Sequence, residues 1–289
     1  MSHPPVAIPE SESYRLRAAD IDQEFEIRVA RPIPGMMGPP GATYDVLYVL
    51  DGDLFFGIAV DMTRIMHQLY GELPPILVVG IGYGSGDPSV AGELRGRDFT
   101  PTTNDEFEQM GRRLMPDREP LLPEGQRLGG GHRFLSFLTG ELAPLIGERY
   151  PVHGMSSLLW GSSLGGLFAL YTLFTAPDAF DGFIVASPAI WWDDDHLFDV
   201  EERSARPDRA RTRLFLGVGG LEEDERVPML APFRMVSNVE EMGRRLGGGR
   251  YDWLDSRTHV FADETHTSVL PAVLTRGLRF VLGPGDRRG

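Results

Sequence analysis

The sequence predicts an α/β fold with a mostly parallel central sheet, helices on both faces and an antiparallel hairpin at the N-terminal edge. From residue 44 onward, short continuous apolar segments alternate with segments of helical spacing, which is typical of parallel strands buried on both faces. Residues 14–31 instead alternate apolar and polar side chains, as strands with one solvated face do. A G-x-S-x-G pentapeptide at residues 161–165 separates a strand-like segment from a helix-like segment, which is where an open α/β sheet carries its functional loops.

Each element follows from its local pattern. The hairpin is expected at residues 14–20 and 24–31, and the buried strands at residues 44–50, 76–81, 157–160, 183–186, 213–218 and 252–261. Helical spacing of apolar residues predicts helices at residues 56–70, 134–150, 166–174, 235–246 and 269–282, with Pro144 kinking the second of them. Residues 84–130 are polar, rich in Gly and Pro and poorly periodic, which predicts a partly mobile, lid-like insertion at the active site. We expect one domain over residues 1–289, with residues 1–12 as a flexible tail.

The composition excludes several classes of mechanism. The chain of 289 residues contains no cysteine, which excludes disulfides, a cysteine nucleophile and cysteine-ligated metals. All 28 basic residues are arginine, so Schiff-base and serine–lysine mechanisms are excluded as well. The formal net charge of −14 opposes binding to nucleic acid and to anionic membranes. We therefore expect a small-molecule substrate, and neither a metal nor another cofactor.

The expected location is the cytoplasm. The sequence has no apolar run of about 18 residues, so we expect no transmembrane helix and no membrane association. The N-terminal segment lacks the basic and apolar regions of a signal peptide, and the lack of cysteine fits a reducing compartment. The sequence does not set the oligomeric state, and a homodimer stays open.

Ser163, at the centre of the pentapeptide, is the candidate nucleophile. Apolar residues precede it at 158–160 and follow it at 167–170, so the serine is expected on a sharp strand-to-helix turn, as in a nucleophile elbow. The start of the following helix favours developing negative charge. The alternative is a turn of small residues with no chemistry.

The base and the acid are expected after the last two strands. His266 follows the last predicted strand and directly precedes a helix, which makes it the candidate general base. Glu222 is the first acid beyond the strand before it, and Glu223 is the alternative; a solvated acidic loop would also explain this segment. The chain order of nucleophile, acid and histidine is the order that α/β-hydrolases use.

An oxyanion hole requires two backbone N–H groups directed at the developing charge. One is expected from Leu164, directly after the nucleophile. The other is expected from Gly52 or Asp53, in the loop after the first core strand.

The sequence also resembles a known family, the esterase D-like branch of α/β-hydrolases and within it the putative-esterase group that contains the enterobactin and ferric-siderophore esterases. The resemblance spans roughly residues 20–283 and is carried by residues 48–53, 79–83, 97–101, 131–135, 161–171, 186–192 and 266–268. It implies an α/β-hydrolase fold, with Ser163 as the nucleophile and His266 as the base. Some siderophore esterases of this group are described as using a Ser–His dyad, so a dyad without Glu222 stays open.

Three residues are candidates for contact with the substrate. Arg97 and Arg95 lie in the insertion, where a guanidinium could bind a carboxylate or a catecholate, or could instead fasten the insertion to the domain. Trp192 follows a core strand at its functional end and could line the pocket or pack in the core.

The expected function is hydrolysis of a carboxylic ester by a serine esterase through an acyl-enzyme, on siderophore-type or other hydroxy-acid esters. A thioesterase and a carbohydrate-ester (feruloyl or acetyl) hydrolase are alternatives with the same machinery. A catalytically silent α/β-hydrolase fold that binds a ligand is an alternative from a different class.

Overall fold

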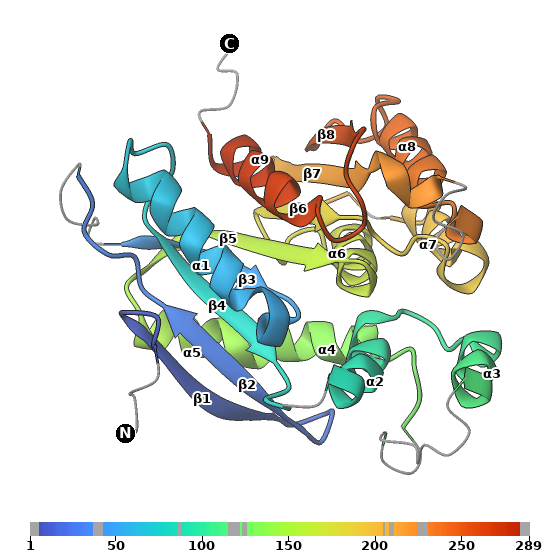
Figure 1. Ribbon diagram of the computed structural model, residues 1–289, viewed down its shortest axis with the longest axis horizontal. Coiled ribbons are helices and arrows are strands. Elements are labelled where there is room, and N and C mark those ends of the chain that lie inside the picture. The colour runs from blue at the N-terminus through green and yellow to red at the C-terminus, as the bar shows by residue number, and fades with distance from the viewer. Residues whose placement is uncertain are drawn as a thin grey trace.

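The central sheet determines where the functional loops lie (Figure 1). The computed structural model describes residues 6–36, 43–85, 88–114, 122, 126–204, 206–207, 211–224 and 231–283. Within these residues, the strands form one sheet in the order β1-β2-β4-β3-β5-β6-β7-β8. The β1–β2 and β2–β4 pairs are antiparallel, and all other neighbouring pairs are parallel. The strands are β1 (Ser11–Ala18), β2 (Gln23–Ala30), β3 (Tyr44–Val49), β4 (Ile76–Gly82), β5 (Val152–Ser162), β6 (Gly182–Ala186), β7 (Thr212–Gly219) and β8 (Leu254–Phe261).

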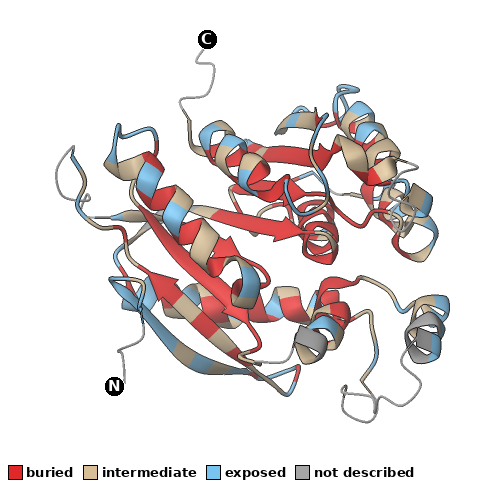
Figure 2. Cartoon of the chain, viewed as in Figure 1, coloured by how far each residue is buried: buried red, intermediate tan, exposed pale blue. Residues whose placement is uncertain are grey.

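Helices cover both faces of the sheet, because successive residues of a buried strand point to opposite sides. In β3, for example, Val46 and Tyr48 belong to one apolar core and Leu47 and Val49 to the other. Figure 2 shows that β4, β6 and β7 are buried almost throughout, as are the C-terminal parts of β3 and β5. The core that includes Leu47 and Val49 is covered by α1 (Gly52–Gln68) and α9 (Leu270–Leu282). The other is covered by α4 (Gly131–Phe137), α5 (Ala143–Arg149), α6 (Leu164–Thr175), α7 (Trp192–Glu202) and α8 (Met235–Leu246).

This architecture confirms the expected mostly parallel sheet with an antiparallel edge hairpin. Several boundaries differ from the expected ones. β1 begins at Ser11, within the expected tail, α1 begins at Gly52, four residues before the expected start, and β5 begins at Val152, five residues before it. The expected kink at Pro144 takes another form. A π-helical turn (Leu138–Leu142) joins α4 to α5, and Pro144 lies in the first turn of α5, where its missing N–H costs little.

The expected insertion contains regular structure that the sequence analysis missed. It holds α2 (Pro88–Phe99) and α3 (Asp105–Leu114), and residues 86–87, 115–121 and 123–125 lie outside the described part. The C-terminal end of α2 is buried against the domain at Arg97, Asp98, Phe99 and Thr100. The helix was missed because its apolar residues are few and it also buries two charged side chains, Arg97 and Asp98.

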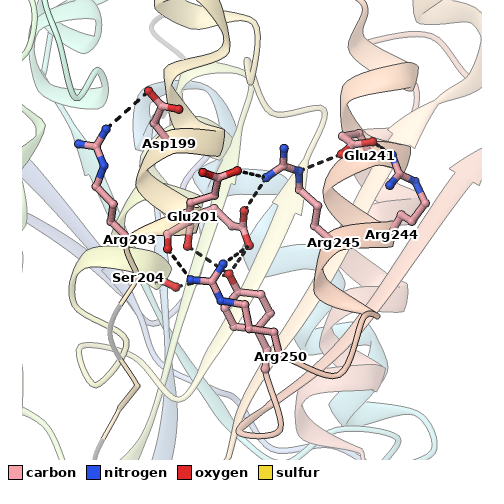
Figure 3. Close-up of polar contacts among 10 residues, drawn as sticks. Asp199, Glu201, Arg203, Ser204, Glu241, Arg244, Arg245 and Arg250 are labelled. Atoms are coloured by element: carbon pink, nitrogen blue, oxygen red, sulfur yellow. Dashed lines mark hydrogen bonds and ion pairs between the residues drawn. The ribbon is translucent and has the colours of Figure 1, made fainter.

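A cluster of ion pairs around the buried Glu201 joins α7 to α8 (Figure 3). Glu201, with a side chain only 3 % exposed, accepts a hydrogen bond of 3.0 Å from Arg245 Nη1, and its carboxylate also accepts from the hydroxyl of Tyr251. Arg245 also bonds Glu241 on its own helix at 2.8 Å. These contacts fix α8, whose first turn contacts the loop that follows β7.

Candidate active site

Ser163 occupies a sharp turn between β5 and α6. Its φ of 57° and ψ of −120° are unfavourable for a residue with a side chain, and such strain is characteristic of functional turns. The backbone holds this geometry by hydrogen bonds: Ser163 N donates to Ala186 O at 3.0 Å, and Ser163 O accepts from Leu167 and from Ala189 at 2.9 and 3.0 Å. The serine side chain is therefore presented at the C-terminal edge of the sheet on a rigid backbone.

The small residues of the pentapeptide are required by close packing. A Cβ atom added to Gly161 would lie 2.2 Å from the carbonyl oxygen of Gly165. No side chain fits at this distance, so the strand can turn back over the helix start only with glycine at this position.

Glu222 and His266 form a direct hydrogen bond. The Nδ1 atom of His266 lies 2.6 Å from Oε2 of Glu222, whose side chain is 0 % exposed, whereas the histidine side chain is 24 % exposed. With Nδ1 donating to the carboxylate, Nε2 is the acceptor nitrogen of the ring, which is the arrangement of a general base oriented by an acid.

The other oxygen of Glu222 is bound as well. Oε1 accepts hydrogen bonds from the hydroxyl of Ser187 at 2.5 Å and from Gly219 N at 2.8 Å. Glu222 lies in a short 3₁₀ turn (Gly220–Glu223) directly after β7. The carboxylate is thus buried, with donors on both oxygens, as a buried charge requires.

Glycines bring the Glu222 turn and the His266 loop together. Added Cβ atoms on Gly219 and Gly220 would lie 2.4 Å from Glu264 O and 2.7 Å from Ala262 O, respectively. Leu221 N also donates to Glu264 O at 3.0 Å. The approach that allows the hydrogen bond between acid and histidine therefore depends on the absence of side chains here.

Glu223, the alternative acid, is bound elsewhere. Its carboxylate accepts from the backbone N–H of Ser237 at 2.7 Å and from the Ser237 hydroxyl at 2.6 Å. Ser237 lies in the first turn of α8, where a negative charge is favourable. The two adjacent glutamates thus have different roles, and only Glu222 is bonded to His266.

The candidate oxyanion-hole donors lie at the starts of two helices. Leu164 is the first residue of α6, and Gly52 and Asp53 are the first two of α1. The first N–H groups of a helix have no partner within it. The two starts are close, because a Cβ added to Gly165 would lie 3.5 Å from Asp51 Oδ2.

Asp51 and Arg95 form a bidentate ion pair beside the elbow. Nε and Nη2 of Arg95 donate to Oδ1 and Oδ2 of Asp51 at 2.8 and 2.9 Å, and Nη2 lies 3.4 Å from the carbonyl oxygen of Ser162. Burial lowers the pKa of Arg95, but the charge and the hydrogen bonds of Asp51, together with the charge of Tyr83, outweigh burial and leave the pKa raised. Arg95 therefore stays protonated next to the candidate nucleophile, with 21 % of its side chain exposed.

Arg97 lies in the interior and is placed as an anchor. Its side chain is 1 % exposed, and it donates to both carboxylate oxygens of Asp98 at 2.7 and 2.8 Å and to Gln126 Oε1 at 2.7 Å. The Tyr83 hydroxyl donates to the same carboxylate at 3.0 Å, and burial together with the charge of Asp98 raises the pKa of Tyr83 well above its ordinary value. Of the two arginines expected to contact substrate, Arg97 has this position in the core, and only Arg95 reaches the site.

The two adjacent tryptophans, Trp191 and Trp192, also differ in burial. Trp192 is 0 % exposed, and its indole N–H donates to Thr102, so it packs in the core. Trp191 is partly exposed and stacks on Phe233, with ring centroids 4.3 Å apart. Between these two tryptophans, Trp191 is the one that reaches the surface.

Sequence reasoning missed Asp51 and Ser187. Both have a positive φ, 52° and 44°. Ser187 directly follows β6, and Asp51 lies two residues beyond the end of β3. Their position after a strand was visible in the sequence, but their backbone conformation and their partners were not.

Comparisons with known proteins agree with this architecture. The family described as Putative esterase matches residues 118–266. Ferri-bacillibactin esterase BesA of Bacillus subtilis is 31 % identical over 96 % of this chain and 91 % of its own, and a siderophore enterobactin esterase of Emericella nidulans is 31 % identical over 90 % of both. The crystal structure of the BES protein from Bacillus cereus superimposes with a TM-score of 0.77 and 28 % identity, covering 97 % of this chain and 98 % of the other.

In the part of the chain that the structure describes, no helix is long and apolar enough to cross a bilayer. The relatives cover nearly the whole chain and carry esterase names. The chain therefore belongs to the putative esterase family, as a carboxylic ester hydrolase with the α/β-hydrolase fold.

Proposed function

We propose that this protein hydrolyses ester bonds through an acyl-enzyme, with Ser163 as nucleophile, His266 as general base and Glu222 as the acid that orients the histidine. The observation that carries the proposal is the hydrogen bond of 2.6 Å between His266 Nδ1 and the buried carboxylate of Glu222. It directs Nε2 of the histidine away from the acid and makes this nitrogen the basic one. This bond favours a triad over a dyad and over a catalytically silent fold.

The reaction follows from this arrangement. His266 Nε2 takes the proton of the Ser163 hydroxyl as Oγ attacks the ester carbonyl, and Glu222 stabilises the imidazolium that forms. The N–H of Leu164 and an N–H of Gly52 or Asp53 bind the oxyanion. Collapse expels the alcohol, which takes its proton from the imidazolium. Water, deprotonated by the same nitrogen, then hydrolyses the acyl-enzyme.

We further propose esters of siderophore type, formed from hydroxy acids, as the substrate class. Two relatives that match nearly the whole chain are named for such esters. Arg95 supports an anionic group on the substrate, because it is the partly exposed cation beside the elbow in a protein of net charge −14. Thioesters and carbohydrate esters could use the same machinery, and a direct comparison of substrates separates them.

A fluorophosphonate probe tests the nucleophile. We expect one labelled serine, identified as Ser163 by peptide mass, and no labelling of Ser163→Ala. Ser136→Ala, which changes an exposed serine of α4, should label like the native protein. Labelling that survives in Ser163→Ala would refute the proposed nucleophile.

Turnover of a substrate panel tests the substrate class. The panel contains a cyclic tri-ester of a hydroxy acid carrying catechol groups, a feruloyl ester, an acetylated sugar and an acyl thioester. We expect the highest kcat/KM for the tri-ester, a loss of at least about 10³-fold in Ser163→Ala, and no effect of a metal chelator. A higher kcat/KM for the thioester or the sugar ester would overturn the proposed substrate class and leave the nucleophile in place.

A further inference from the structure

Ser187 has an unusual position for a buried serine. It directly follows β6, is 0 % exposed and has a φ of 44°. A residue with a Cβ atom is unfavourable in this left-handed region, where glycine is the usual choice. Ser187 N donates to Gly217 O of the neighbouring strand at 2.7 Å, which holds the residue in this conformation.

The strained backbone directs the hydroxyl at Glu222. Ser187 Oγ donates to Oε1 of Glu222 at 2.5 Å, and Gly219 N donates to the same oxygen at 2.8 Å. Oε2 is left for His266. Two donors on one oxygen restrict rotation of the carboxylate, so that the other oxygen points at the imidazole.

The order of strands in the sheet explains why the Ser187 hydroxyl reaches Glu222. β5, β6, β7 and β8 are neighbours in this order, and they are followed by Ser163, Ser187, Glu222 and His266, respectively. Ser187 therefore lies between the candidate nucleophile and the candidate acid. Its hydroxyl is bonded to the acid, and its backbone continues from Ala186, whose carbonyl binds Ser163 N.

We propose that Ser187 is a positioning residue of the catalytic site. Its hydroxyl orients the Glu222 carboxylate, and through Glu222 it sets the tautomer and the direction of His266. It contacts neither substrate nor reacting atoms. This inference rests on the proposed triad and assigns a fourth side chain to it.

Steady-state kinetics on a neutral p-nitrophenyl ester test the inference. Ser187→Ala should lower kcat by about 10- to 100-fold, the usual effect of removing a residue that orients a ligating or catalytic one, and KM should change by less than about 2-fold because substrate contacts remain. Ser187→Gly should lose as much kcat as Ser187→Ala, although it relieves the left-handed backbone. A Ser187→Gly variant with native kcat would overturn the role of the hydroxyl.

A double-mutant cycle separates positioning from general stabilisation. In a protein that already carries Glu222→Gln, Ser187→Ala should change kcat by less than about 2-fold, because the hydroxyl acts only through the carboxylate. Equal losses in both backgrounds would overturn the inference. Ser157→Ala is the matched control, because its hydroxyl bonds the carboxylate of Asp181 at 3.3 Å next to the opposite end of β6, and its kcat should stay native.

The low-field proton resonance of His266 Nδ1–H gives a readout that needs no activity. It should be present in the native protein, absent in Glu222→Gln, and shifted or broadened in Ser187→Ala. An unchanged resonance together with unchanged kcat would refute the inference while the esterase proposal stands. A shifted resonance in a protein that hydrolyses no ester would refute the proposed function while the positioning role stands.

Discussion

Replacement of Arg97 by methionine should destabilise the protein strongly and should not act on substrate affinity. Methionine keeps most of the side-chain volume and removes the charge and the three donated hydrogen bonds, two to Asp98 and one to Gln126. The Asp98 carboxylate, 1 % exposed, then keeps only the Tyr83 hydroxyl as its close donor among these residues.

The magnitude follows from burial. Removing one partner of a buried ion pair costs about 3–5 kcal/mol, because the other charge stays buried without compensation. With a urea m-value of about 3 kcal/mol per M, the unfolding midpoint should fall by about 1–1.7 M. Adding Asp98→Asn should restore part of the loss, because the uncompensated charge is then removed.

Urea unfolding followed by tryptophan fluorescence measures this change. Arg17→Met is the matched control: Arg17 pairs with Asp22 at the surface, with side chains 65 % and 75 % exposed, and its loss should cost at most about 1 kcal/mol. If Arg97→Met costs less than the control and raises KM only for anionic esters, Arg97 contacts the substrate and the anchoring role is wrong.

Three further results are expected. Glu223→Gln should lower the free energy of unfolding by about 1 kcal/mol, because it weakens the acidic contact at the start of α8, and should leave kcat within 2-fold; a large loss of kcat would contradict this. Arg95→Met should lower kcat even for neutral esters, because Asp51, 6 % exposed, then lies unpaired beside the start of α1; a native kcat would show that the pair is dispensable. Burial and the charge of Arg276 lower the pKa of His259 in the folded protein, so the unfolded chain protonates this imidazole more readily. The neutral His259 therefore contributes fully to the free energy of unfolding above about pH 6.5, and this contribution is lost as the pH falls through the lowered pKa of the folded state. His259→Gln should therefore reduce the fall in melting temperature between pH 7 and pH 5, and an unchanged fall would refute the assignment.

The elements that were predicted correctly are determined by sequence patterns within a few residues of one another. The alternation of β1 and β2, the continuous apolar strands β4 and β6 and the helical spacing of α8 depend on neighbours within a few residues. The helix α2 was missed because part of its buried surface depends on contacts that are not local. Its C-terminal end buries the ion pair of Arg97 and Asp98, and a charged pair leaves no hydrophobic periodicity in the sequence.

The sequence by itself determined the sheet, the turn at Ser163 and the chain order of the candidate triad, because strand pattern, small residues and connection order are all local or sequential properties. Only the tertiary structure decided which of two adjacent glutamates faces His266. The bond from His266 to Glu222 spans 44 residues and the bond from Ser187 to Glu222 spans 35, and both exist because β6, β7 and β8 are neighbours in the sheet. Glu222 and Glu223 are equivalent in the sequence because they are adjacent and have the same side chain. In the structure their carboxylates point in different directions from one short turn, so that Glu222 binds His266 and Glu223 binds the start of α8.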